Sequence, residues 1–313
     1  MSEFNFAPAP WVPFQDKAVL DTLRVMTREQ LEAHPNPDFQ IKVDVNPGAI
    51  GLMDMYNRIA ESDRLNKKVV MVCGNPCPDA YTPVARLINL RRINCRNVFC
   101  FTMDEWADDM GNIAPTDYKS GFTYSFLKYF YGMIDPELRM PESNIFYPTT
   151  KNINEYSKML TEVGEGGADV IYSGPGWAAH IAFIDPCPEL MPENISIDEY
   201  IKQPAKVVTL HPLTIMQNSC HGVFGCSGDV ANVPPKAATI GPLDVMNAKD
   251  IIEVHNLVTM GTFSSWQRMT SRLILHGPVT PWVPGTILQL RKTAVYVSES
   301  LAAPIEVMEM VGY

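Results

Sequence analysis

The chain has 313 residues, 46% hydrophobic and 19% charged, so it can bury a full core as one large domain or two small ones. Its 25 basic and 35 acidic residues give a formal net charge of −10, which excludes a basic field for nucleic acid or an anionic membrane. No apolar run approaches the roughly 20 residues that span a bilayer, and no signal-type segment opens the sequence. We therefore expect a cytoplasmic protein without nucleic-acid or membrane partners.

Seven cysteines are scattered along the chain, and none has the paired two-residue spacing of a zinc ribbon. Reduced cysteine behaves as a small apolar residue of the core, so we expect free, buried thiols. The sequence indicates neither a metal site nor a cofactor. We expect a small molecule as the ligand.

The first 46 residues are predicted to form an N-terminal extension, which begins with the polyproline-like arm of residues 7–13 and continues in a helix over residues 17–33. This extension is expected to wrap the domain or a neighbouring subunit of a homo-oligomer. Asn46 as N-cap and Pro47 at the first helical position then predict a helix to about residue 61. An α/β domain over residues 47–313 is expected to start there.

Continuous apolar runs predict strands at residues 69–73, 98–103, 170–172, 207–210, 251–259 and 294–297, because strands of a parallel sheet are covered on both faces. Helical patterns lie between them, at residues 80–91, 118–131, 153–162 and 265–276. This alternation predicts a doubly wound, mostly parallel α/β sheet with helices on both faces, which is a Rossmann-like fold. Ligands of such sheets bind at the carboxyl ends of the strands.

Two adjacent carboxylates, Asp104 and Glu105, follow the strand predicted at residues 98–103. A carboxylate in a crevice can remove a proton next to a carbonyl, and partial burial moves its pKa toward the working pH. The two side chains are expected to face opposite ways. A solvated acidic pair that opens a loop or caps a turn explains the same residues without chemistry.

The loop of residues 173–186 follows the strand predicted at residues 170–172 and contains His180. Small residues such as Gly176 let backbone amides approach a ligand, and histidine is the side chain that ordinarily titrates near neutrality. Asp185, five residues later, can orient the imidazole and select its tautomer. A hydrogen-bonded histidine of the core is the alternative interpretation.

Gly74 and Asn75 open the turn Gly-Asn-Pro-Cys-Pro after the first strand, where a phosphate-binding turn would lie. Its two prolines carry no N–H donor, so this is a poor phosphate turn. A rigid connection from strand to helix explains it equally well.

The segment Gly-Thr-Phe-Ser-Ser at residues 261–265 leads into a helix that carries Gln267 and Arg268. Hydroxyls at a helix N-terminus can hold an anion. Simple capping of the helix by Ser264 is the alternative.

Together these motifs resemble the glucosamine-6-phosphate deaminase (isomerase) family, which is related to the 6-phosphogluconolactonases. That family shows Asn-Met-Asp-Glu-Tyr at a strand end, Pro-Glu-Ser-Tyr before a helix, and Gly-x-Gly-x-Asp-Gly-His-Ile-Ala-Phe-Asn-Glu-Pro. Here the matches are Thr-Met-Asp-Glu-Trp at residues 102–106, Pro-Thr-Asp-Tyr at residues 115–118, and the His180 loop. Later landmarks follow in order, so the resemblance covers residues 47–300, and the His-Ile-Ala-Phe run favours the deaminase branch.

The resemblance implies an aldose–ketose isomerisation coupled to loss of the 2-amino group as ammonia. In the family, the first Asp of the acidic pair takes the C2 proton, and Asp104 matches it. The loop His opens the sugar ring with help from flanking acids. His180 matches this residue, with Asp185 where the family has Glu.

The same loop departs from the family at Ala178, which stands where the family has an Asp that relays the ring-opening proton, and at Ala179, where it has Gly. Trp177 beside them either closes over a ligand or fills the gap left by the missing Asp. We favour the filling role.

The phosphate contacts of the family also differ here. Its Gly-Gly-Thr-Pro turn aligns with residues 75–78, its helix Lys with Gln267, and its phosphate Arg with Cys220. Charge-assisted contacts contribute about 1.5–3 kcal/mol each, so losing two weakens a phosphate ligand on the order of 10²-fold or more. Arg268 and His221 lie next to the altered positions and are candidate replacements.

Two functions remain open at this point. One is a divergent isomerase or deaminase acting on an amino sugar or sugar phosphate, and the other is a sugar-binding or regulatory protein with impaired catalysis. A lactonase is less favoured, since it would also need the missing Lys and Arg. The candidate catalytic residues are Asp104, Glu105, His180 and Asp185, and the candidate substrate-binding residues are Gly74, Asn75, Gly176, Trp177, Ser264, Gln267 and Arg268.

Overall fold

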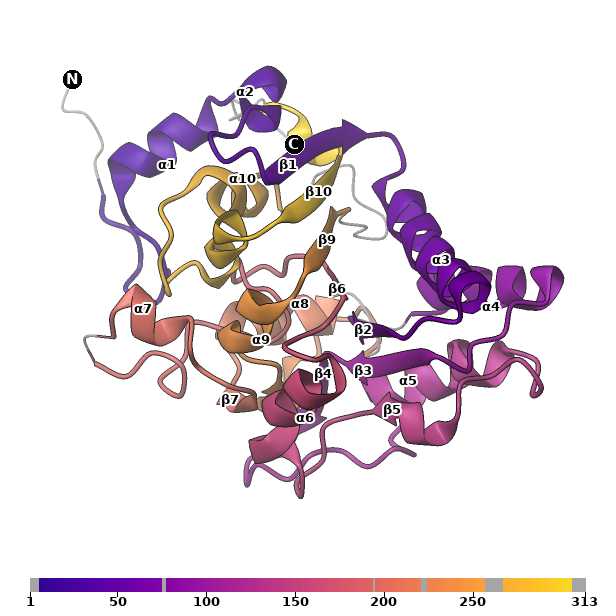
Figure 1. The fold of residues 1–313 in the computed structure, drawn as a ribbon. Helices are drawn as coiled ribbons and strands as arrows, with labels where there is room; N and C mark the ends of the chain where they lie inside the picture. Colours follow the sequence, from indigo (N-terminus) through magenta and orange to yellow (C-terminus); the bar gives the residue numbers. More distant parts are fainter. Residues whose placement is uncertain (1–5, 75–76, 194, 221–223, 257–266, 306–313) are drawn as a thin grey trace.

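The computed structural model describes residues 6–74, 77–193, 195–220, 224–256 and 267–305. Their centre is a seven-stranded sheet in the order β1-β10-β9-β6-β2-β3-β5, with every neighbouring pair parallel (Figure 1). The strands are β1 (Phe39–Asp44), β2 (Val69–Cys73), β3 (Val98–Thr102), β5 (Ile145–Phe146), β6 (Val170–Ser173), β9 (Asp250–His255) and β10 (Thr293–Ser298).

Both faces of this sheet are buried, because successive side chains of a strand point to opposite sides. In β2, Val70 and Val72 pack into one hydrophobic core, whereas Met71 and Cys73 pack into the other. The continuous apolar runs therefore predicted the buried parallel strands correctly. The doubly wound, mostly parallel α/β fold is confirmed.

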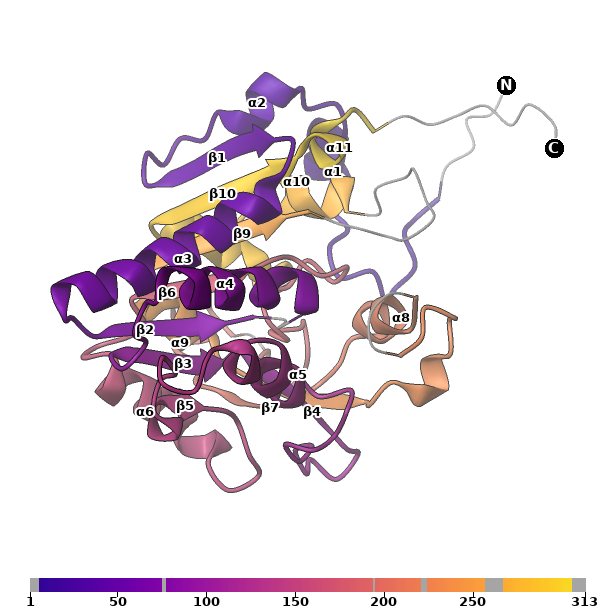
Figure 2. The same ribbon diagram turned by 90° about the vertical axis from the view of Figure 1, so that its right-hand side faces the viewer.

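One face of the sheet is covered by α3 (Pro47–Leu65), α4 (Pro78–Arg91) and α5 (Phe122–Tyr129), and α3 and α4 lie side by side in Figure 2. The other face is covered by α6 (Tyr156–Val163), α9 (Pro242–Asn247) and α10 (Arg268–His276). The Asn46 side chain accepts from Ala49 N at 3.3 Å, so this residue is the predicted N-cap of α3. None of the described helices combines the length and the apolar character that a membrane crossing requires.

A second, three-stranded antiparallel sheet has the order β4-β8-β7, with β4 (Asp104–Ala107), β7 (Lys206–Thr209) and β8 (Lys236–Thr239). The prediction that the strand near residues 207–210 joins the parallel sheet is wrong. A short apolar run fits either sheet, because its residues do not reveal whether the neighbouring strand runs parallel or antiparallel to it. The chain passes from β3 through Met103 directly into β4, which places Asp104 at the junction of the two sheets.

The N-terminal part is more closely integrated than we expected, since β1 pairs with β10 and the sheet thus begins before residue 47. The helix expected over residues 17–33 is two helices, α1 (Lys17–Arg24) and α2 (Arg28–Glu32). Thr27 starts the second one with a capping box to Gln30, which separates it from the first. The arm reaches across the molecule, where His211 Nε2 lies 3.3 Å from the Trp11 carbonyl.

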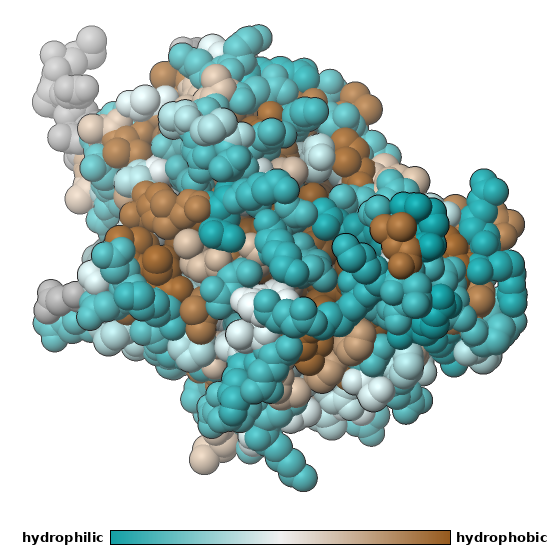
Figure 3. All heavy atoms as spheres, viewed as in Figure 1, coloured by the Kyte–Doolittle hydropathy of each residue, from teal (hydrophilic) through white to brown (hydrophobic). Residues whose placement is uncertain are grey.

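The remaining boundaries differ modestly from the sequence pattern. β9 ends at His255, and α10 begins at Arg268, so residues 257–259 and 265–266 of the predicted elements lie outside the described residues. The short helices α7 (Ile197–Tyr200) and α11 (Glu299–Ala302) and the longer α8 (Pro212–Cys220) complete the fold. The seven cysteines are all described and are free thiols, four of them buried. The surface in Figure 3 is largely hydrophilic, with apolar patches between the polar side chains.

Candidate active site

The main cavity lies at the carboxyl ends of the parallel strands and has a volume of about 880 Å³. Gly74, Met103, Ser173 and Asn256, which directly follow or end β2, β3, β6 and β9, line its floor, and the first turns of α3 form one wall. The strand arrowheads in Figure 2 point toward this side of the molecule, where α8 also lies. The position agrees with the site expected for a doubly wound sheet.

Asp104 faces this cavity with a side chain that is almost completely buried. Only 7% of the residue is exposed, and no described residue hydrogen bonds to its carboxyl group. Burial, and secondly the adjacent charge of Glu105, raise the pKa of Asp104 well above its usual range. A carboxylate that is neither solvated nor paired is a stronger base than an ordinary aspartate.

Glu105 points the opposite way, as the strand alternation predicts, but its expected catalytic role is not supported by its position. Its carboxylate accepts hydrogen bonds from the backbone N–H groups of Trp106, Phe122 and Thr123 at 2.9, 3.1 and 2.8 Å. It is fully buried and anchors the start of α5, where the N-cap Gly121 has no side chain to offer. Glu105 is a structural residue, because three amides already occupy its oxygens.

His180 and Asp185 form the pair that the sequence predicts. His180 Nδ1 hydrogen bonds to Asp185 Oδ1, and the imidazole lines the cavity. Asp185 is fully buried and also accepts from Thr214 Oγ1 at 2.9 Å and from His211 N at 2.7 Å. This network directs an Nδ1–H toward Asp185 and leaves Nε2 as the ring atom available to a ligand.

Gly176 is required by the position of this imidazole. A Cβ atom at residue 176 would lie 1.9 Å from His180 Nε2, a separation that no side chain tolerates. Gly176 also lines the cavity. The loop therefore uses this glycine to give the histidine space, in addition to exposing backbone to a ligand.

Strand β8 contacts both the histidine loop and the strand that carries Asp104. Phe183 N in the loop donates to Thr239 Oγ1 at 3.1 Å, and Thr239 is the partner of Asp104 in the β4–β8 ladder. The relative position of Asp104 and His180 is consequently set by β8. Thr214 and Thr239, which the sequence interpretation missed, carry no motif that would identify them before the fold is known.

The loop holds two alanines in the left-handed region, Ala179 with φ +58° and Ala182 with φ +53°. This conformation costs a non-glycine residue about 1–2 kcal/mol. Ala179 is the position at which the resembling family has Gly. The surroundings maintain its conformation, since Gly285 N donates to the Ala179 carbonyl at 2.8 Å.

The described lining of the cavity contains no lysine or arginine. Gly74 lines the cavity next to Met103, and its carbonyl accepts from Tyr81 Oη at 2.8 Å. Gln267 lines the cavity beside the histidine loop and donates to the Pro175 carbonyl at 2.8 Å. Asp79, in the first turn of α4, places a carboxylate there instead, which the sequence interpretation missed.

Three of the residues named from the sequence lie outside the described part of the chain, namely Asn75, His221 and Ser264. The stretches that contain them, residues 75–76, 221–223 and 257–266, include no lysine or arginine. The absence of lysine and arginine from the cavity therefore does not depend on the placement of these stretches.

The structure places Arg268 away from the cavity, so its predicted role in substrate binding is wrong. Its guanidinium donates to the carbonyls of Ser300 at 2.8 Å and Pro304 at 3.0 Å. A shift of one residue along a helix rotates a side chain by roughly 100°, which explains why Gln267 faces the cavity and Arg268 does not.

Trp177 is also not among the described residues that line the main cavity. It is partly buried, and its backbone N–H donates to Gln217 Oε1 of α8 at 2.5 Å. This contact attaches the histidine loop to α8. Closure of Trp177 over a ligand, one of the two interpretations from the sequence, has no support in this arrangement.

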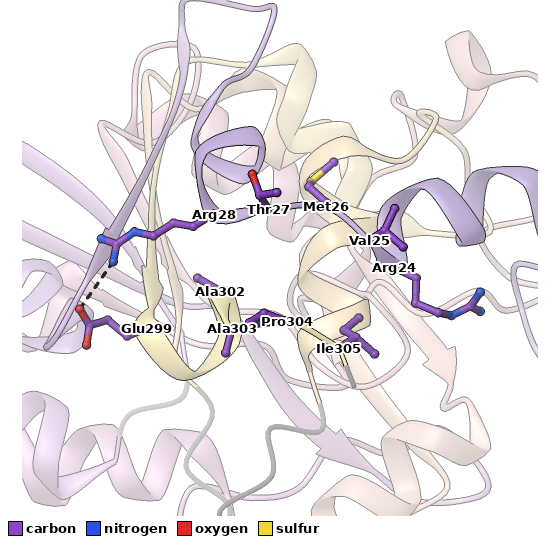
Figure 4. Close-up of a pocket in the computed structure, with 10 residues that line it drawn as sticks. All are labelled: Arg24, Val25, Met26, Thr27, Arg28, Glu299, Ala302, Ala303, Pro304 and Ile305. Atoms are coloured by element: carbon purple, nitrogen blue, oxygen red, sulfur yellow. Dashed lines mark ion pairs between the residues drawn. The ribbon is translucent and has the colours of Figure 1, made fainter. Parts of the chain in front are cut away.

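A second, smaller cavity of about 430 Å³ lies between the α1–α2 connection and the end of α11 (Figure 4). Its two arginines already have acidic partners, since Arg28 Nη1 lies 3.7 Å from Glu299 Oε1 and Arg24 pairs with Asp21. None of the candidate catalytic residues lines it. The main cavity is therefore the candidate active site.

No protein-family model matches the chain, but curated proteins of similar sequence are found. Glucosamine-6-phosphate deaminase of Dictyostelium discoideum is 26% identical over 242 residues, which cover 75% of this chain and 80% of that protein. The enzyme of the same name from Lachnoclostridium phytofermentans is 26% identical over 198 residues, covering 61% and 71%.

Solved structures show the same fold. A monomeric glucosamine-6-phosphate deaminase superposes with a TM-score of 0.66 at 19% identity, covering 84% of this chain and 98% of that one. The 6-phosphogluconolactonase of Leishmania guyanensis gives 0.56 at 11% identity, covering 85% and 98%. By sequence the chain is similar to curated glucosamine-6-phosphate deaminases, and by fold it is similar to a glucosamine-6-phosphate deaminase and to 6-phosphogluconolactonases; together these likenesses support a divergent relative of these proteins.

Proposed function

We propose that this protein is a divergent isomerase/deaminase that acts on an amino sugar by ring opening and abstraction of the C2 proton. The observation that carries the proposal is the meeting of Asp104 and His180 in one cavity, with both tied to strand β8. An acid–base pair of this kind suits an aldose–ketose isomerisation. The names of the curated relatives favour the same chemistry.

In the proposed reaction His180 moves a proton between the C1 hydroxyl and the ring oxygen, which opens the ring and exposes the C1 aldehyde. Nε2 performs this transfer, since Nδ1 is committed to Asp185. Asp185 is a positioning residue in this scheme, because within the described part of the chain its carboxylate hydrogen bonds to His180, Thr214 and the His211 backbone, and it is not among the residues that line the cavity. Its burial keeps the imidazole in one orientation.

Asp104 then takes the proton from C2, giving an enolamine, and a proton is returned to C1. The resulting imine at C2 is hydrolysed by water, so the products are a ketose and ammonia. The raised pKa of Asp104 fits this role, because a base near the working pH both accepts and returns a proton readily.

A sugar-binding protein without turnover is the second candidate, and a specific observation favours it. Ala178, only 2% exposed, places a methyl group where the resembling family has a proton-relaying Asp. Lactone hydrolysis of a phosphorylated sugar is less favoured, since the cavity lining contains no lysine or arginine among the described residues.

The proposal is tested by incubating the purified protein with glucosamine, glucosamine 6-phosphate and N-acetylglucosamine 6-phosphate, and by measuring ammonia and ketose. We expect turnover of an amino sugar that falls about 10²- to 10⁴-fold in Asp104→Asn, the range for a lost general base. Asp109→Asn, an exposed aspartate of the loop after β4, is the matched control and should retain activity. Retained binding with no turnover of any sugar would instead support the non-catalytic candidate.

A further inference from the structure

We propose that the main cavity takes an aminated, unphosphorylated polyol and discriminates against a phosphate group, with Asp79 as a specificity-determining residue. The inference rests on the proposed function for the sugar nature of the ligand, and it adds the substrate class. It differs from the substrate that the names of the curated relatives contain, which is a phosphorylated sugar.

The first observation is the sign of the fixed charge. Asp79 and Asp104 are the acidic residues of the described lining, and no lysine or arginine accompanies them. Asp79 is exposed at the start of α4, next to the Gly74 turn, and no described residue forms a salt bridge with it. Because burial raises the pKa of Asp104, the fixed negative charge is that of Asp79, and a phosphate beside it would have no lysine or arginine of the described lining to compensate it.

The second observation is that the N-terminus of α4 offers few amides to an anion. Pro78 occupies the first helical position and has no N–H. Ala80 N and Tyr81 N donate to the Cys77 carbonyl at 3.2 and 3.1 Å. Only Asp79 N remains of the donors that a helix N-terminus ordinarily presents, and the side chain of that same residue is an anion.

The third observation concerns the floor of the cavity, where Ser173 Oγ donates its only proton to the Glu253 carboxylate. Glu253 is fully buried, and His255 Nε2 lies 3.5 Å from its other oxygen, Oε1. Ser173 consequently presents an acceptor to a ligand. Gln267 donates one N–H to the Pro175 carbonyl and keeps its second N–H and its carbonyl oxygen.

Acceptor-rich, negatively charged surroundings favour ligands that carry hydroxyl and ammonium donors. Phosphate oxygens are acceptors, so they would face acceptors at Ser173 and Asp79. An amino polyol offers the complementary groups. The cavity volume of about 880 Å³ accommodates a hexose-sized ligand with its ordered water.

The test measures binding without turnover, using open-chain alditols in which the reacting C1 carbonyl has been reduced. The probes are 2-amino-2-deoxyglucitol, its 6-phosphate, and glucitol, and binding to the full chain is measured by isothermal titration calorimetry. We expect the amino alditol to bind about tenfold or more tightly than its 6-phosphate. Glucitol, which lacks the amine, should bind more weakly than the amino alditol.

The specificity role of Asp79 is tested in the same assay. Asp79→Asn should reduce the discrimination against the 6-phosphate, because it removes one negative charge from the mouth of the cavity, and Asp79→Lys should reverse it, because it replaces that charge with a positive one. Asp109→Asn, equally exposed but not at the cavity, should change neither affinity. Asp79 side-chain hydrogen bonds are absent among the described residues, so both variants are expected to fold.

Tighter binding of the 6-phosphate than of the amino alditol would overturn the inference, as would binding of neither compound. A preference that is present but unchanged in Asp79→Lys would overturn the role of Asp79. If the amino alditol is preferred and glucosamine is not turned over, the proposed catalytic function fails while the ligand class stands. If glucosamine 6-phosphate alone is turned over, the catalytic function stands and this inference fails.

Discussion

Two groups of residues that line the main cavity differ in how their polar groups are satisfied. In the first group, Asp104 is buried without a hydrogen bond from a described residue, whereas the buried His180–Asp185 pair is hydrogen bonded. In the second group, Gly74 and Gln267 direct hydrogen-bonding groups to the protein itself, and Asp79 carries a carboxylate. The comparison indicates that chemistry and ligand recognition can diverge separately within one site.

The largest effect is expected for the first group. Asp104→Asn should lower turnover about 10²- to 10⁴-fold, because the amide cannot accept the C2 proton. Its thermal stability should be equal to or greater than that of the wild type, since a buried, unpaired carboxyl is removed. Steady-state kinetics and a thermal melt of the same preparation check both statements, and unchanged turnover would exclude Asp104 as the base.

Asp185→Asn should lower turnover about 10- to 100-fold, because Asp185 orients His180 and is the partner that selects its tautomer. The fall should appear mainly in kcat, whereas KM changes little. Thr214→Val removes only one of the hydrogen bonds to Asp185 and should have a smaller effect. Equal losses in kcat for the two variants would contradict the positioning role of Asp185.

Glu105→Gln sharpens the contrast with Asp104, since the two carboxylates are adjacent but have different functions. Its amide would place an N–H against backbone donors at the start of α5, so the free energy of unfolding should fall by about 1–3 kcal/mol. Turnover per folded molecule should be unchanged. Urea unfolding measures the change in stability, and rates normalised to the folded protein measure the change in turnover. A loss of turnover as large as that of Asp104→Asn would restore the catalytic assignment of Glu105.

The smallest expected effect is a pH dependence. Because burial raises the pKa of Asp104 above its ordinary value of 3.8, the folded protein holds that proton more tightly than the unfolded chain does. Stability is therefore expected to fall as the pH rises from about 4 through the raised pKa, and activity to rise over the same interval as the base forms. Asp104→Asn should make the free energy of unfolding less dependent on pH. Urea unfolding of the wild type and the variant at a series of pH values measures this dependence.

Much of the parallel sheet and part of the site could be predicted from the chain itself. β2 and residues 170–172 of β6 were recognisable because both of their faces are buried and their residues form continuous apolar runs. The pairing of His180 with Asp185 was accessible because both lie in one short loop. The strand β1 alternates apolar and polar residues, which is typical of a half-buried edge strand, and a prediction based on continuous apolar runs misses it.

Residues that act through distant partners could not be assigned in advance. Thr214 and Thr239 hold Asp185 and the histidine loop from separate elements, and neither belongs to a local motif. Arg268 looked like a replacement cation until the phase of α10 directed it to the carbonyls of Ser300 and Pro304. The side-chain direction on a helix depends on where the helix begins, which the pattern locates only to within a few residues.

The sequence by itself determined the fold class, the order of the motifs and the two residues most suited to acid–base chemistry, since these depend on local periodicity and on residue types. Tertiary structure alone decided that Glu105 supports a helix, that Ser173 is an acceptor and that Asp79 faces the cavity. The physical reason is that a polar side chain acquires its role from the partners that satisfy it, and those partners come from distant parts of the chain.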